Sequence, residues 1–246
     1  MSLVATLLTL AVLSWPMPTF AANEDRATAA KQLLDESGVQ GGLVVHLGCG
    51  DGTLTTALRA DERYLVHGLD RDPANVNRTR KAIRASGLAG QVSVEAIEGD
   101  RLPYTDNLVN LIVAENLGDV SETELLRVLC PRGVALVRDG EEWREIVKPW
   151  PAEIDEWTHY LHGPDNNAVA RDSVVGPPQH VQWIAGPKWA RGHEHLATVS
   201  IAVTAGGRMF YLADDGPTAS VDLPAAWNVT ARDAFNGTLL WQKPIP

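Results

Sequence analysis

The sequence predicts an α/β fold of the Rossmann-like type, a doubly wound parallel sheet, followed by a short β segment. Three observations lead to this prediction. Short apolar runs alternate with amphipathic stretches between residues 24 and 137, a glycine-rich loop follows the first of these runs, and the composition changes near residue 140.

The first half alternates between predicted helices and strands. Asp72 is a typical helix N-cap, Pro73 suits the first helical position, and Gly87 ends that helix. Strands separated by helices imply a parallel sheet with helices on both faces, whose ligand lies beyond the carboxyl ends of the strands. The predicted strands are 42–47, 64–69, 92–97, 109–114 and 133–137, and the other predicted helices are 24–37, 53–60 and 121–129.

The second half has a different composition. Seven of the eight tryptophans and ten of the fifteen prolines fall at or after Trp143. Short strands joined by glycine-rich turns are expected at 201–203, 209–212, 229–231 and 239–241. We therefore divide the chain into a Rossmann-like domain at 22–147, a Trp/Pro-rich connector at 148–196 and a β segment at 197–246.

The first residues resemble a signal peptide, assigned to 1–21. An apolar run from Leu3 to Trp15 precedes Pro16 and Pro18, which interrupt it before it reaches the length of a spanning helix. The expectation is an exported, periplasmic or extracellular protein without stable membrane insertion. If the segment is not a true signal, the protein is cytoplasmic.

Charge and cysteine content narrow the function. With 21 basic and 31 acidic residues the net charge is −10, which disfavours a nucleic-acid partner. The two cysteines imply no disulfide framework. A small-molecule ligand is the expected partner, and a protein partner is not identified.

The loop Gly48, Gly50 and Gly52 directly follows a predicted strand. Glycine lets the backbone turn sharply and approach a ligand closely. Asp70 lies eighteen residues after Gly52, at the end of the second strand, where a carboxylate can accept hydrogen bonds from ribose hydroxyls. Together these features predict a nucleoside site; the alternative is a structural turn and a surface aspartate.

The glycine spacing is GxGxG, because Thr53 stands where the dinucleotide fingerprint GxGxxG needs glycine. Residues 44–52 resemble motif I of class I S-adenosylmethionine-dependent methyltransferases, 68–70 their second-strand acidic motif, and 99–103 their adenine-flanking loop. The resemblance implies S-adenosylmethionine as cofactor and methyl transfer if the site is active. It implies cofactor contacts from Gly48, Cys49, Gly50, Gly52, Asp70, Arg71, Asp100, Arg101 and Glu115.

Two positions depart from that family. His46 stands where the family usually carries an acidic residue that helps hold the cofactor's ammonium group, and Arg132 interrupts the usual Pro-Gly-Gly. No catalytic residue is predicted, because methyl transfer needs mainly alignment of the reacting groups.

Residues 231–241 resemble the blade signature of quinoprotein-like, pyrroloquinoline quinone-type (PQQ-like) β-propellers, with Asn236 and Gly237 turning a hairpin before Trp241. One blade cannot close a propeller, so the expectation is a partial blade of a longer, truncated protein that cannot enclose PQQ. The alternative is a small β appendage that packs on the α/β domain.

Two further residue groups are interpreted as structural. His193 and His195 have no third ligand at a recognisable spacing, so no metal site is predicted. Four tryptophans are expected to pack between the domains: Trp150, Trp157, Trp183 and Trp189.

The leading hypothesis is therefore an exported methyltransferase-like domain fused to part of a PQQ-like propeller. A catalytically degenerate binding or scaffold protein is the first alternative. A nicotinamide-dependent (NAD-type) oxidoreductase, disfavoured by Thr53, is the second.

Overall fold

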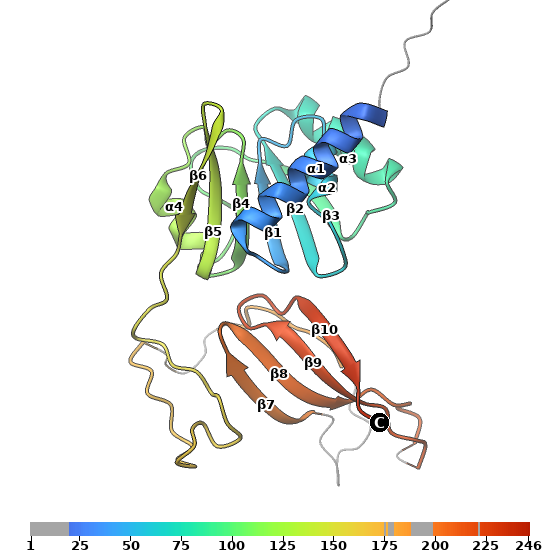
Figure 1. The fold of residues 1–246 in the computed structure, drawn as a ribbon, viewed down its shortest axis with the longest axis vertical. Helices are drawn as coiled ribbons and strands as arrows, with labels where there is room; N and C mark the ends of the chain where they lie inside the picture. The colour runs from blue at the N-terminus through green and yellow to red at the C-terminus, as the bar shows by residue number, and fades with distance from the viewer. Residues whose placement is uncertain (1–19, 175, 177–179, 188–198, 221) are drawn as a thin grey trace, which may run out of the picture.

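The computed structural model describes residues 20–246 except 175, 177–179, 188–198 and 221. These residues form a six-stranded sheet with helices, followed by a separate four-stranded sheet. Figure 1 shows the two sheets one above the other, joined by a long connecting segment.

The first unit contains four helices and six strands in alternation. Its helices are α1 (Phe20–Ser37), α2 (Thr53–Ala57), α3 (Pro73–Ala85) and α4 (Glu122–Val128). Its strands are β1 (Gly42–Leu47), β2 (Tyr64–Asp70), β3 (Val92–Ala96), β4 (Val109–Ala114), β5 (Leu129–Asp139) and β6 (Glu142–Val147). Every predicted element of this half is confirmed in type, although α2 ends three residues before the predicted end.

The strand order β3-β2-β1-β4-β5-β6 is that of a doubly wound sheet. The first five strands are parallel to their neighbours, and the chain crosses from β3 at one edge to β4 beside β1. The order therefore reverses between β1 and β4, where such sheets bind ligands. The sequence predicted a parallel sheet. The observed sheet is mixed, because β6 pairs antiparallel with β5.

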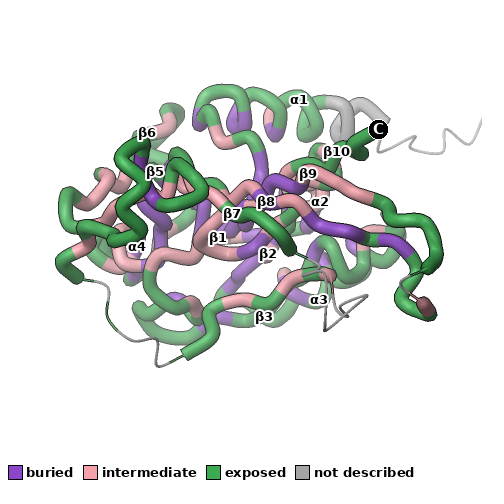
Figure 2. Tube along the Cα trace, turned by 90° about the horizontal axis from the view of Figure 1, so that it is seen from below, coloured by how far each residue is buried: buried purple, intermediate pink, exposed green. Residues whose placement is uncertain are grey.

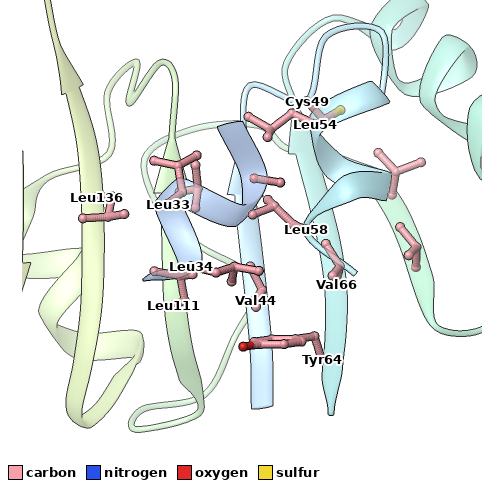
Figure 3. Packing of buried hydrophobic residues seen from close by; sticks show 14 of the residues in the cluster. Leu33, Leu34, Val44, Cys49, Leu54, Leu58, Tyr64, Val66, Leu111 and Leu136 are labelled. Atoms are coloured by element: carbon pink, nitrogen blue, oxygen red, sulfur yellow. The ribbon is translucent and has the colours of Figure 1, made fainter. Parts of the chain in front are cut away.

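Two buried clusters cover the two faces of this sheet. Alternate residues of β1 point to opposite sides: Val44 packs with α1, α2 and α3, whereas Val45 packs with α4. Figure 3 shows the first cluster, with Leu33 and Leu34 of α1 lying close to Leu111. Every residue of β1 and β4 is buried, so the core lies along the central strands. Figure 2 shows buried segments, in purple, at β1 and β2.

The start of α3 follows the local rules that the sequence displays. The Asp72 side chain accepts a hydrogen bond from Ala74 N, Pro73 occupies the first turn, and Gly87 beyond the helix has φ 71°. The N-cap carboxylate therefore fixes where α3 begins, next to the end of β2.

The second sheet is antiparallel, with the order β10-β9-β8-β7. Its strands are β7 (Val199–Ala205), β8 (Arg208–Asp214), β9 (Trp227–Asp233) and β10 (Leu239–Pro244). Each contains a predicted strand and is longer. The turns between β7 and β8 and between β9 and β10 contain Gly206, Gly207 and Gly237, all with positive φ.

The turn after β9 contacts the first unit at the start of its strands. Asn236 Nδ2 donates to Leu108 O and Asn110 Oδ1, at 2.9 and 2.6 Å. The Trp150 ring of the connector lies 6.3 Å from the Phe235 ring. The second sheet therefore contacts the amino ends of the parallel strands and leaves their carboxyl ends open.

Several sequence predictions fall outside the described residues. The assigned signal peptide lies almost wholly in residues 1–19, and Trp189, His193 and His195 lie within 188–198. In the part of the chain that is described, no helix is both long enough and apolar enough to cross a membrane.

Candidate functional site

The glycine loop connects β1 to α2 in a conformation that glycine favours. Gly48, Gly50 and Gly52 have φ values of 83°, 55° and 85°. Gly52 also permits close packing, because a Cβ there would lie 2.7 Å from Thr79 Cα of α3. The loop therefore depends on glycine at Gly52 for two independent reasons.

Asp70 points toward this loop. Its Oδ2 accepts a hydrogen bond from Gly50 N at 3.0 Å, and its Oδ1 accepts one from Asp72 N at 2.9 Å. Burial opposes ionisation of Asp70, but these hydrogen bonds and those from Asn75 outweigh it and lower the pKa of the carboxyl. The prediction that Asp70 lies beside the glycine loop is therefore confirmed. Because its pKa is lowered, the Asp70 side chain is a carboxylate anion in the folded protein.

Asn75 of α3 is the neighbour that sequence reasoning missed. Its Nδ2 donates to both carboxylate oxygens of Asp70, each at 3.0 Å. With Gly50 and Asp72, this gives the carboxylate four hydrogen bonds, about its full acceptor capacity. A ribose hydroxyl that binds Asp70 must therefore replace one of these partners. Asn75 is the one partner that uses a side chain, and its Oδ1 in turn accepts a hydrogen bond from Arg78 Nη2.

A cavity of about 70 Å³ adjoins Gly48 and Asp70. Leu69, Ile97 and Val120 give it apolar walls, and Asn116 and Arg71 add polar groups. Apolar walls beside a carboxylate suit one edge of a purine base whose ribose contacts that carboxylate. The donor set fits a nucleoside, but the cavity must widen to take a whole one.

Arg71 lies at the rim of this cavity. Its Nη2 donates to Gly99 O at 2.7 Å, and its Nη1 lies 3.6 Å from Asp119 Oδ2. It thereby links the loop after β3 to the loop after β4.

Asp100 and Arg101, the predicted adenine-loop residues, are exposed, and neither lines the cavity. The cavity wall from that part of the chain is Ile97. Their proposed cofactor contacts therefore need a rearrangement of the loop that begins at Gly99.

Cys49 contributes only its backbone to the loop. Its side chain is buried in the core, where Thr79 Oγ1 donates to Sγ at 3.4 Å. Burial raises the pKa of the thiol to about 11, so it is not a thiolate at neutral pH. Its small side chain fills the space below the loop.

His46 and Glu115 lie near Gly48, but neither lines the small cavity. The His46 ring is fully buried, and its Nδ1 is 2.8 Å from Thr55 Oγ1 of α2. Glu115 follows β4 and pairs with Arg26 of α1, whose Nη1 lies 3.3 Å from Glu115 Oε1. Sequence reasoning missed Arg26, because no local motif marks a helix residue that reaches another strand's end.

In the described part of the chain, no group of three or more histidines, cysteines and carboxylates is arranged to hold a metal ion. The His162–Asp155 pair, at 2.7 Å, lies in the connector and lacks a third ligand there.

Comparison with known proteins supports the assignment of the first unit. Residues 44–133 match the sequence model of a methyltransferase domain family. No curated protein matches the chain.

Solved structures with similar arrangements include three proteins. A protein from Methanococcus maripaludis, assigned as an S-adenosyl-L-methionine-dependent methyltransferase, has 22% identity over 48% of this chain and 56% of its own, with a TM-score of 0.43. Geranyl diphosphate C-methyltransferase from Streptomyces coelicolor A3(2) has 19% identity, 45% and 44% coverage and a TM-score of 0.42. The [4+2]-cyclase SpnF has 25% identity, 45% and 43% coverage and a TM-score of 0.41.

This chain spans about half the length of these solved structures. The family match covers β1 through the first part of β5, which includes the glycine loop, Asp70 and Glu115. Residues 44–133 therefore resemble a methyltransferase domain in sequence and lie within a Rossmann-like fold.

Proposed function

We propose that the first unit binds S-adenosylmethionine at the carboxyl ends of β1, β2 and β4 and transfers its methyl group to a small molecule. The observation that carries this proposal is the direct contact of Asp70 with Gly50 N, 3.0 Å, beside an apolar cavity. It unites a ribose-binding carboxylate with a loop whose backbone can approach a ligand. The family match over the same residues supports the choice of cofactor.

The residues have distinct roles in this proposal. Asp70 accepts hydrogen bonds from the ribose hydroxyls. Gly48, Gly50 and Gly52 allow the loop to approach the cofactor closely. Leu69, Ile97 and Val120 flank the base, while Arg71 covers it. S-adenosylmethionine supplies an activated methyl group when bound, and the chain's own part is to orient it and exclude water.

The second sheet is included in the proposal as a blade-like unit of a quinoprotein-like propeller in an exported protein. Its four antiparallel strands and the turn at 233–237 support this interpretation. Quinone binding by this sheet alone is not proposed.

A scaffold without catalysis is the second candidate. The observation that favours it is the full set of hydrogen bonds on Asp70, which satisfies the carboxylate without ligand. In that case the domain supports the second sheet and does not bind nucleosides.

Titration of the full chain with S-adenosylmethionine in a calorimeter tests the proposal. We expect saturable binding, weakened on the order of tenfold by Asp70→Asn, because a charge-assisted hydrogen bond is lost. Asp61→Asn is the matched control, since Asp61 precedes β2 at its opposite end and pairs with Arg63. Absence of heat and of thermal stabilisation at millimolar ligand would leave the scaffold candidate. Preferential stabilisation by NAD would instead support the oxidoreductase alternative.

A further inference from the structure

Glu115 stands between two cavities at the ligand edge of the sheet. Its neighbour Asn116 lines the small cavity beside Asp70. Glu115 itself lines a second cavity of about 440 Å³, together with Arg26, Leu54 and Trp143. A ligand whose nucleoside lies beside Asp70 therefore reaches the larger cavity by passing Glu115.

The Arg26–Glu115 ion pair at this passage is accessible. The side chains are 48% and 35% exposed, and the closest N–O distance is 3.3 Å. Exposed pairs of this kind contribute little to stability, because water screens both charges. A ligand that offers a cation to Glu115 and an anion to Arg26 can replace the pair at little cost.

His46 supplies an independent sign that a polar group is missing here. Its Nε2 is buried, has no hydrogen-bond partner, and lies 3.9 Å from Glu115 Oε2, beyond hydrogen-bond length. Burial lowers the pKa of the imidazole to about 4, so the ring is neutral at physiological pH. Position 46 therefore provides neither the negative charge that would attract an ammonium group nor a positive charge that would repel it.

We propose that Glu115 and Arg26 recognise the zwitterionic amino-acid end of the nucleoside ligand. The Glu115 carboxylate binds the ammonium group of the ligand, and the Arg26 guanidinium binds the carboxylate of the ligand. The negative charge thus comes from the end of β4 instead of the end of β1, where His46 stands. This inference rests on the proposed function, since it assigns the second half of the same ligand.

Two ligands separate this inference from the proposed function. S-adenosylhomocysteine and 5′-methylthioadenosine share the adenosine and a neutral thioether, but only the first carries the amino-acid end. Calorimetry on the full chain measures both affinities in the wild type, Glu115→Gln, Arg26→Gln and Glu122→Gln. Glu122 is the matched control, because it forms an exposed ion pair with Arg144 of β6, at 3.0 Å.

We expect Glu115→Gln and Arg26→Gln each to weaken S-adenosylhomocysteine binding on the order of tenfold and to change methylthioadenosine binding less than about twofold. Glu122→Gln changes neither. Equal weakening of both ligands, or of neither, overturns the inference while the nucleoside site stands. If the wild type binds neither ligand, the proposed function fails and the inference with it. Melting curves of each variant confirm that it is folded.

Discussion

His46 couples the stability of the fold to pH. Burial lowers the pKa of its imidazole from the ordinary 6.5 to about 4, so the unfolded chain binds a proton that the folded chain rejects. The stability due to the neutral ring is complete above pH 6.5 and is lost as the pH falls toward 4. We expect the free energy of unfolding to drop between pH 7 and pH 5, with His46 responsible for on the order of 2 kcal/mol.

Urea unfolding of wild type and His46→Gln at the two pH values measures this contribution. The variant retains a polar group beside Thr55 but does not titrate. His67 also has a pKa lowered by burial and adds to the pH dependence of both proteins, so only the difference between them reports His46. An identical pH dependence in both proteins contradicts the assignment.

At this scale the sequence predicts some contacts and not others. The pairing of Gly50 with Asp70 follows from a spacing that is visible in the chain, because β1 and β2 are adjacent parallel strands. The contact of Asn75 with Asp70 depends on a rotamer at the start of α3. The contact of Arg26 with Glu115 joins residues 89 positions apart. No local pattern encodes either of these contacts.

The packing of α2 against α3 depends on Gly52. A Cβ at this position would lie 2.7 Å from Thr79 Cα, and the φ of 85° is unfavourable for other residues. We expect Gly52→Ala to lower the free energy of unfolding by about 2–4 kcal/mol, through backbone strain and overpacking together, and to weaken ligand binding.

Gly87→Ala is the matched control for this prediction. Gly87 has a similar φ of 71°, but nothing lies within 4 Å of its ideal Cβ, so only the backbone term of about 1 kcal/mol remains. Urea unfolding of both variants gives the difference. Equal losses would mean that α3 moves aside without cost and that Gly52 is needed only for its φ.

The elements of the first unit were predictable where their sequence patterns are local. Strands β1 and β4 have the predicted bounds, because both are mostly apolar and are buried at every position, with His46 and Asn110 as their polar residues. Strand β6 was missed, since Glu142, Arg144 and Glu145 give it the composition of a loop. It forms a strand because Gly140, with φ 63°, turns the chain back along the free edge of β5.

The two sheets are joined by a buried polar contact that the sequence did not reveal. The sequence predicted that Asn236 and Gly237 form a hairpin turn, and Gly237 has the positive φ that such a turn needs. The same turn also contacts Asn110 of β4. Asp233 Oδ2 accepts a hydrogen bond from Asn110 Nδ2 at 2.7 Å, and both residues are buried. Burial raises the pKa of Asp233.

A buried carboxylate that loses its donor is costly, so this contact fixes how the second sheet meets the first. Asn110 also serves its own domain, because its Oδ1 accepts a hydrogen bond from Leu43 N at 2.8 Å. The single variant Asn110→Ala therefore mixes the two effects. A double-mutant cycle with Asp233→Ala separates them.

We expect the cycle to give a coupling energy of about 1–3 kcal/mol between Asn110 and Asp233, measured by urea unfolding of the full chain. Limited proteolysis of the connector should accelerate in each single variant, since the second sheet then detaches more readily. The proposed nucleoside site lies at the opposite ends of the strands, so ligand affinity should stay within about twofold of the wild type. If the losses in free energy of unfolding of the two single variants simply add in the double variant, the Asn110–Asp233 contact does not couple the two sheets. The second sheet would then be held to the first only by the connecting segment.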